Sequence, residues 1–321
     1  MVRPLLLIAV LAAAAGVASA DPAPAPQQQD PQPKAEDAGP LRTRQTTLRR
    51  IFKGPFQSSR LFSMPTADTV GPYMLSLSGD GSLLQQTGLL TSAGVLAIGF
   101  GDIAQLEYRH SAAISISGVN APLPGIGAQA KIPLPEGGNI PALGIALRLG
   151  VPRTEQFGGT AVVEKVHDVF LVSRLRFDAI SWLTLHGGVR YSYAQIELTG
   201  EHALAKPLTK GLWLPTGGYE IAMNPTSKIV GEIALAPKFS WMQGTEEPPT
   251  IGYGLLGRLG LRWSVLPSLV IDGSIGYQLE VANAAPASGL DAVVQWDIRL
   301  GAEVFVPWGA LACRAVGAFC E

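Results

Sequence analysis

The chain has 321 residues, and its 24 basic and 25 acidic side chains leave a formal net charge of −1. This balance gives no support to nucleic-acid binding, which requires a basic face. Only 15% of the residues are charged, yet after the leader no uninterrupted apolar run reaches the roughly 18 residues that a membrane-spanning helix needs. The apolar residues must therefore be distributed in another pattern.

The first 20 residues have the pattern of a secretory signal peptide. Arg3 precedes an apolar run from Leu5 to Ala15, and the small residues Ala18 and Ala20 form an A-x-A cleavage pattern. The residue directly after the cleavage site is Asp21 and not Cys, so we expect no lipid modification. We therefore predict export and cleavage after Ala20.

Residues 21–60 form a linker with two different compositions. Residues 21–40 hold six Pro and four Gln, so they cannot bury enough surface to offset their ordering entropy and are predicted to be extended and disordered. Residues 41–60 carry six basic side chains and no acidic one. This second part is either a solvated basic tether, an arm for anionic partners or a plug for a lumen.

From about residue 70, apolar and polar side chains alternate with a period of two. Residues 269–281 are the clearest example, and 253–263, 294–306 and 143–151 repeat it. The alternation predicts strands with one apolar face. Segments of up to thirteen residues exceed the usual length of about five or six and suit a tilted strand that crosses a bilayer.

Short and long connections alternate between the predicted strands, which is typical of bacterial outer-membrane barrels with short periplasmic turns. The first four strands have a weak signal, so ten strands are the alternative to twelve. The twelve predicted strands are residues 70–78, 94–100, 103–110, 127–133, 142–151, 166–177, 182–198, 217–223, 228–241, 251–263, 269–281 and 292–306.

Aromatic residues mark both ends of several predicted strands. Trp182 and Trp263 lie beside short turns, and Tyr193 and Tyr253 lie 11 and 10 residues away on the same strands. About ten residues of a tilted strand climb roughly 25 Å, the height of the apolar band between two aromatic girdles. The pattern favours a transmembrane barrel over a soluble, lipocalin-like one.

The segment 70–307 resembles the β-barrel outer-membrane proteins of Gram-negative bacteria. Its sharpest motif, residues 299–306 (RLGAEVFV), is similar to the terminal-strand signal that the barrel-assembly machinery reads. Two features depart from that pattern: the motif ends in Val306 instead of an aromatic residue, and fifteen residues follow it. The resemblance implies an all-β, antiparallel up-and-down barrel over 61–307 in contact with outer-membrane lipid. It also implies recognition by that machinery through Arg299, Gly301, Val304 and Val306.

The sequence offers no catalytic constellation. The resemblance implies that a lipid hydrolase on such a barrel would place His and Ser two residues apart on one strand face. None of the four histidines meets this condition, and His186 and Ser192 share a face but lie six residues apart. No cluster has metal-ligand spacing. We expect no enzyme activity, metal or cofactor, and a lipid hydrolase is the least favoured alternative.

The polar positions of the strands predict a charged lumen. If Gly260 faces Asp272 across the hairpin at 264–268, Asp272 lies diagonally from both Arg258 and Arg262. Arg148, Arg174 and Arg176 would then face the lumen with fewer acids nearby in sequence, and anions should accumulate where their charge is uncompensated. The candidate lumen residues are Arg148, Arg174, Arg176, Arg190, Arg258, Arg262, Asp272, Asp297 and Arg299.

Two functions fit such a lumen. One is a porin-like channel that passes small polar solutes or ions. The other is an occluded structural, envelope-anchoring or surface-interaction barrel, in which interior ion pairs satisfy one another.

The tail 308–321 carries Cys313 and Cys320, and it is expected in the periplasm, an oxidising compartment. In one continuous helix their Cα atoms would lie about 10.5 Å apart, beyond disulfide reach. A bond between them therefore requires a compact loop.

Overall fold

The computed structural model describes residues 59–84, 89–115, 118–119, 123–134, 140–241, 248–279 and 296–316. These residues all belong to one unit, Gln45–Glu321. The predicted signal peptide, the Pro- and Gln-rich linker and most of the basic segment lie outside the described residues.

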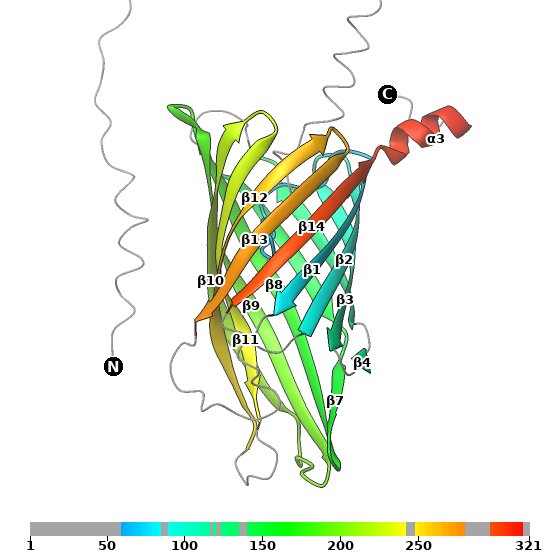
Figure 1. The fold of residues 1–321 in the computed structure, drawn as a ribbon, viewed down its shortest axis with the longest axis vertical. Coiled ribbons are helices and arrows are strands. Elements are labelled where there is room, and N and C mark those ends of the chain that lie inside the picture. Colours follow the sequence, from blue (N-terminus) through cyan, green and yellow to red (C-terminus); the bar gives the residue numbers. More distant parts are fainter. Residues whose placement is uncertain are drawn as a thin grey trace, which may run out of the picture. The chain divides into compact units, whose positions relative to one another are not determined.

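Twelve long strands in the described part of the chain form a closed antiparallel barrel (Figure 1). Pairing of the first strand with the last closes the wall. The prediction of twelve strands is confirmed, and the alternative of ten is wrong. The strands are β1 (Leu75–Leu84), β2 (Leu89–Phe100), β3 (Ala104–Ser115), β5 (Leu123–Ile132), β6 (Ala142–Gly150), β8 (Thr160–Phe177), β9 (Ile180–Gly200), β10 (Leu208–Asn224), β11 (Ser227–Ser240), β12 (Thr250–Leu266), β13 (Leu269–Leu279) and β14 (Trp296–Val306).

Two further short strands extend the wall. β4 (Gly118–Val119) pairs with β3, and β7 (Arg153–Phe157) pairs with β8. β5 also pairs with β3, so β4 extends the line of β5. β6 also pairs with β8, so β7 extends the line of β6.

The alternation along each strand separates two faces of the wall. On β14, Ile298, Leu300 and Val304 are exposed on the outside, whereas Arg299 and Glu303 are buried inside. This arrangement places the apolar set against lipid and the polar set in the lumen, as a membrane-spanning barrel requires.

Short turns join the strands at one end of the barrel. Two-residue turns lie at residues 178–179, 225–226 and 267–268, and α3 (Trp308–Val316) follows β14 at the same end, uppermost in Figure 1. We call this the short-turn end; in outer-membrane barrels it faces the periplasm. Among the helices in the described ranges, none is both long and apolar enough to cross a membrane.

The predicted aromatic residues lie on the outer surface at two levels. Trp182 and Trp263, near the short-turn end, are 52% and 56% exposed, and Tyr193 and Tyr253, farther along the same strands, are 41% and 45% exposed. The outer face therefore has an aromatic girdle at each level, with apolar side chains between them.

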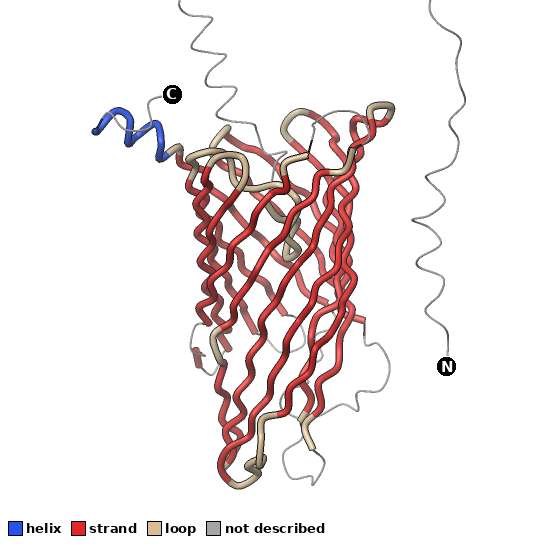
Figure 2. Tube along the Cα trace, turned by 180° about the vertical axis from the view of Figure 1, so that it is seen from behind, coloured by secondary structure: helices blue, strands red, loops and turns tan. Residues whose placement is uncertain are grey.

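The first strand begins later than the sequence predicts. A strand is predicted over residues 70–78, but β1 begins at Leu75, and the residues before it run inside the barrel. In Figure 2 they form the tan loop that descends into the barrel from the short-turn end. Pro65, Gly71 and Pro72 in this stretch disfavour a continuous ladder, because proline lacks the amide donor that a ladder requires.

Candidate functional site

Residues 59–74, here called the lumen finger, fold back on themselves within the barrel. An antiparallel bridge joins Arg60 to Pro65, and the Leu61 amide donates to the Met64 carbonyl over 2.9 Å, closing a turn at residues 61–64. We call this turn the tip. The second leg, residues 65–74, leads into β1 at the short-turn end. Ser59 and Arg60, the described residues of the first leg, run antiparallel to it.

A single carboxylate binds the backbone amides of the tip. The amides of Phe62, Ser63 and Met64 donate to Oε2 of Glu232, with N–O distances of 2.8, 2.9 and 3.3 Å. The Ser63 hydroxyl donates to the other carboxylate oxygen. Successive amides of a tight turn form a concave anion site, and here the anion is a buried side chain of β11.

The carbonyl oxygens of the tip accept hydrogen bonds from three guanidiniums on three other strands. Charge-assisted bonds of this kind are stronger than those between neutral groups. Arg262 donates to the carbonyls of residues 60 and 61 (3.1 and 2.5 Å), Arg299 to that of residue 62 (3.4 Å) and Arg148 to that of residue 63 (2.9 Å).

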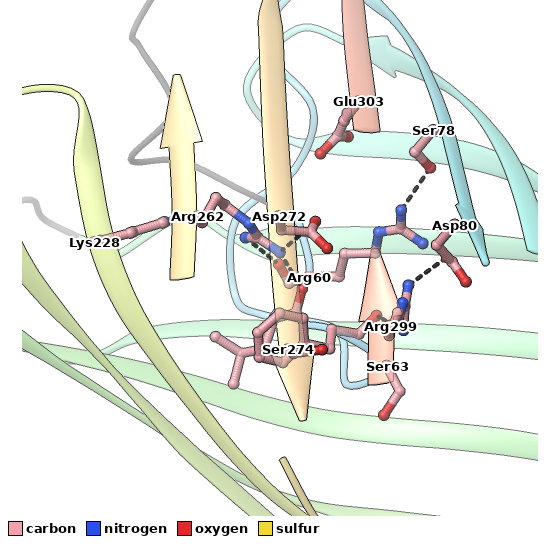
Figure 3. A network of polar contacts seen from close by, with 12 residues as sticks. Arg60, Ser63, Ser78, Asp80, Lys228, Arg262, Asp272, Ser274, Arg299 and Glu303 are labelled. Carbon is pink, nitrogen blue, oxygen red and sulfur yellow. Dashed lines mark hydrogen bonds and ion pairs between the residues drawn. The ribbon is translucent and has the colours of Figure 1, made fainter. Parts of the chain in front are cut away.

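Figure 3 shows part of this network from close by. Arg262 points at the Arg60 backbone, while the Arg60 guanidinium donates to the Ser78 hydroxyl over 2.5 Å. Arg299 also pairs with Asp80 of β1. Of the basic segment 41–60, only Ser59 and Arg60 are described, and both belong to the lumen finger.

The second leg is held by wall side chains closer to the short-turn end. Gln129 donates to the carbonyls of Thr66 and Asp68 over 2.8 and 2.6 Å, and Arg174 pairs with the Asp68 carboxylate. Gln105 accepts from the amide at residue 70 over 2.7 Å. Wall strands on several sides of the barrel therefore hold the lumen finger along its length.

The base of the lumen finger is joined to α3. Tyr73 has a positive φ of 53°, which is uncommon outside glycine. Its carbonyl accepts the Gly309 amide over 3.1 Å, and its ring meets Trp308 edge to face, with 5.6 Å between centroids. The first turn of α3 thus fixes the conformation in which the finger connects to β1.

The lumen finger also packs against apolar wall residues. Leu61, Phe62, Met64 and Ala67 are buried in one cluster with inward residues of β6, β8 and β11. The lumen finger and the wall therefore share one apolar cluster. The wall members of the cluster are Ala146, Phe170, Val172 and Val230.

Three wall glycines leave room for the lumen finger. A methyl group added at Gly99 would lie 2.4 Å from the Gly71 carbonyl oxygen, and one at Gly218 would lie 2.3 Å from the Leu61 side chain. At Gly144 it would lie 3.1 Å from the backbone of residue 67. The wall therefore accommodates the lumen finger through glycines that leave space for its backbone and side chains, as well as through charged residues that bind it.

Two of the predicted lumen arginines form ion pairs with acidic residues that are distant in the sequence. Nε of Arg148 lies 3.0 Å from Glu107 Oε1, and Arg174 pairs with Asp68 of the lumen finger. Arg148 and Arg174 therefore have acidic partners, which are remote along the chain. Arg176 lies exposed near the short-turn end of β8.

The predicted register of the β12–β13 hairpin is also wrong. Asp272 faces Arg262, while Gly260 faces Ser274. The strands continue to a two-residue turn at 267–268, so the hairpin axis lies farther along the chain than predicted. Asp272 lies 3.8 Å from Arg262, whereas Arg258 donates to the Ser274 hydroxyl over 3.4 Å.

The remaining candidates are distributed around the wall. Arg190 binds Asp168 through two bonds of 2.8 Å, and Ser192 donates to the same carboxylate over 2.6 Å. Asp297 lies in β14, but its side chain is outside the described residues, as is Cys320. Cys313 lies in α3, so the disulfide stays a prediction.

A separate buried network contains His186, Glu220 and Lys228. Lys228 Nζ donates to Glu220 over 2.7 Å, and His186 Nε2 lies 3.9 Å from the same carboxylate. Ser192, which was considered together with His186 as a possible catalytic pair, donates its hydroxyl to Asp168. Within the described ranges, no three His, Cys, Asp or Glu side chains gather as a potential metal site.

A second apolar cluster lies far from the short-turn end, among the ends of β8 to β12. Lys210 Nζ donates to the Ile251 carbonyl there over 2.6 Å. This cluster is separate from the one that contains the lumen finger. The members of this second cluster are Val162, Ala194, Ile196, Leu198, Leu212, Leu214, Trp241 and Ile251.

A lumen plug was one of the alternatives for residues 41–60, but the sequence did not predict that residues 61–74 enter the lumen, nor that Glu232, Gln105 and Gln129 bind them. A local signal was present: apolar residues at 61, 62 and 64 stand directly after the basic segment, without strand alternation. No sequence signal paired this stretch with particular wall residues.

The closed wall, the apolar outer band and the two aromatic girdles define a transmembrane β-barrel of the outer-membrane type, with a segment of its own chain in the lumen. No protein-family model matches the sequence, and no curated protein matches it.

Among solved structures, the chain is similar to the porin NanC, with 10% identity, a TM-score of 0.44 and coverage of 72% of this chain and 98% of that one. It is also similar to the porin KdgM, with 10% identity, a TM-score of 0.42 and coverage of 71% and 98%. The translocator domain of the autotransporter NalP from Neisseria meningitidis has 14% identity, a TM-score of 0.39 and coverage of 82% and 96%. Similarity at this level indicates neither a solute nor an activity.

Proposed function

We propose that this protein is a non-enzymatic, porin-like barrel of the outer membrane that passes small polar solutes or ions, and that the lumen finger closes it at rest. The observation that carries this proposal is the clamp on the tip. Glu232 holds three amides, and the guanidiniums of Arg148, Arg262 and Arg299 hold the neighbouring carbonyls.

The path of the lumen finger suits a reversible closure. Arg60 pairs antiparallel with Pro65, so the described chain turns back on itself at the tip, and its second leg joins the wall only at β1. A permanently filled interior would be served as well by apolar residues, since burying charges carries a large desolvation cost. Charged side chains such as Arg262 and Glu232 suit a lumen that fills with water when the finger leaves.

The alternative is an occluded structural or envelope-anchoring barrel. Apolar packing around Phe62 and the contact between Tyr73 and α3 favour it, because both hold the lumen finger in place. The two functions differ in whether the finger ever leaves.

Ion current in planar bilayers distinguishes these functions. The full-length chain is compared with a finger variant in which residues 60–67 are deleted, because the clamp binds backbone groups that any replacement of equal length would keep. A matched control carries a deletion of residues 205–207, which are exposed in the loop before β10. We expect rare openings from the full-length chain and the control, and steady current from the finger variant.

Other outcomes would contradict the proposal. Silence of the finger variant, with folding verified by heat-modifiable migration on gels, would favour the occluded barrel. Steady current from the full-length chain would show that the lumen finger does not close the lumen. Hydrolysis of a lipid ester by the purified barrel would favour the hydrolase.

We also infer that β14 carries the assembly signal. Val304 is exposed on the outer face, whereas Arg299 is bonded inside to Asp80. A methyl group added at Gly301 would lie 2.6 Å from the Asp272 carboxylate, so this glycine also makes room for a lumen side chain. Gly301→Ala should therefore disturb packing as well as assembly, while Val306→Ala should affect assembly alone, as measured by folded yield in outer membranes.

A further inference from the structure

The tip of the lumen finger is itself a peptide ligand. Its described polar contacts with Glu232 and the three arginines use backbone groups, apart from the Ser63 hydroxyl. The wall therefore recognises amide N–H and carbonyl groups in a turn, whatever side chains the turn carries.

We infer that the wall groups that hold the tip form a binding site for short peptides with an apolar side chain, and that such peptides are preferred solutes of the channel. This inference rests on the proposed function, because the site is available only when the lumen finger has left. The site consists of Glu232, Arg262, Arg299 and Arg148.

The arrangement of charges selects for a ligand with both donors and acceptors. Glu232 accepts from N–H groups, so it suits an α-ammonium or an amide. The guanidiniums of Arg148, Arg262 and Arg299 suit a carboxylate or a carbonyl. A simple anion engages only the arginines and a simple amine only the carboxylate, whereas a peptide engages both sets at once.

Apolar wall side chains belong to the same buried cluster as the tip. Phe62 is buried in one cluster with Phe170, Val172 and Val230. The guanidinium of Arg262 also lies 5.8 Å from the centre of the Phe62 ring, a distance at which cations attract aromatic faces. A ligand with an aromatic or large aliphatic side chain would take the place of Phe62 in this cluster and remove its surface from water.

Calorimetry and current block test the site independently of each other. The finger variant is titrated with Gly-Phe-Gly, with Gly-Gly-Gly, and with sodium acetate and ethylammonium chloride. We expect Gly-Phe-Gly to bind, and to block the current half-maximally, at concentrations on the order of tenfold lower than the other three. Adding Glu232→Gln should remove the preference for Gly-Phe-Gly over sodium acetate, while Asp168→Asn, which changes a wall pair whose described bonds do not reach the lumen finger, should retain it.

The outcomes separate the two proposals. Calorimetric binding without any current would overturn the proposed passage and leave the peptide site standing. Current that all four probes block equally, with no preferential binding, would overturn the peptide site alone. Should the finger variant not fold, the full-length chain serves instead: Gly-Phe-Gly should raise its current by displacing the lumen finger and acetate should not, and no rise would contradict the inference.

Discussion

On β12, Leu259, Leu261 and Trp263 lie exposed on the outer face, whereas Arg262 between them is buried and donates to the lumen finger. The outer face needs side chains that are apolar, because lipid offers no hydrogen-bonding partners. The inner face needs particular partners at particular positions, because a buried polar group without one is costly. Substitutions on the outer face should therefore alter the stability of the folded barrel in the membrane. Substitutions on the inner face should alter the closure of the lumen by the finger.

Glu232→Ala is expected to have the largest effect on closure. It removes the acceptor for three amides and a hydroxyl of the tip, at a cost of roughly 3 kcal/mol. That cost corresponds to about a 100-fold rise in the ratio of open to closed barrels, which open probability in single-channel recordings measures.

Asp168→Asn is the matched control, because Asp168 binds Arg190 and Ser192 within the wall. If both substitutions raise the open probability equally, the effect reflects a general loss of interior charge and the role of the clamp is refuted.

Leu259→Arg probes the opposite face of the same strand. Leu259 lies about midway between Trp263 and Tyr253, so the new charge would face the apolar band. We expect a loss of about 2–4 kcal/mol of folded stability in lipid, measured by urea unfolding in vesicles. Open probability should not change; a marked rise would show that the two faces are not independent.

Gly99→Ala tests the fit between wall and finger. The added methyl group would meet the carbonyls of residues 70 and 71 at 2.6 and 2.4 Å, so we expect overpacking to cost about 1–3 kcal/mol and to favour the open state. Gly94→Ala on the same strand is the control, because its methyl group meets nothing closer than 3.9 Å. Equal open probabilities for the two variants would contradict the fit.

Trp308→Ala should have the smallest effect. It removes the edge-to-face contact with Tyr73, which contributes about 1 kcal/mol in typical aromatic pairs. We expect roughly a fivefold rise in open probability. An effect as large as that of Glu232→Ala would place the main restraint on the lumen finger at α3 instead of at the tip.

The sequence predicts the wall well because the outer face obeys a local rule. Alternation of apolar and polar residues located twelve strands and separated Leu300 from Arg299. The β12–β13 register depends on the position of the turn at 267–268. Moving this turn by one residue along the chain changes the partner of each strand residue by two positions. The sequence pattern alone did not fix that position.

The lumen finger could not be assigned from the sequence, because its partners are remote along the chain. Phe62 and Glu232 are 170 positions apart, and Phe62 and Arg299 are 237 apart. Charges at lumen positions were predicted, but their partners depend on which segment enters the barrel. That choice is made by the three-dimensional fit of the tip to the wall.

Labelling of a cysteine at the tip tests the central claim most directly. Met64→Cys is introduced in a chain with Cys313→Ser and Cys320→Ser, and its reaction with a membrane-impermeant maleimide is followed in folded, lipid-embedded protein. Ala179→Cys, in an exposed turn at the short-turn end, gives the reference rate. Because Met64 is only 2% exposed, we predict labelling far slower than the reference, and a marked acceleration when Glu232→Ala is added. Labelling of Met64→Cys as fast as that of Ala179→Cys, with Glu232 intact, would contradict a finger held inside the barrel.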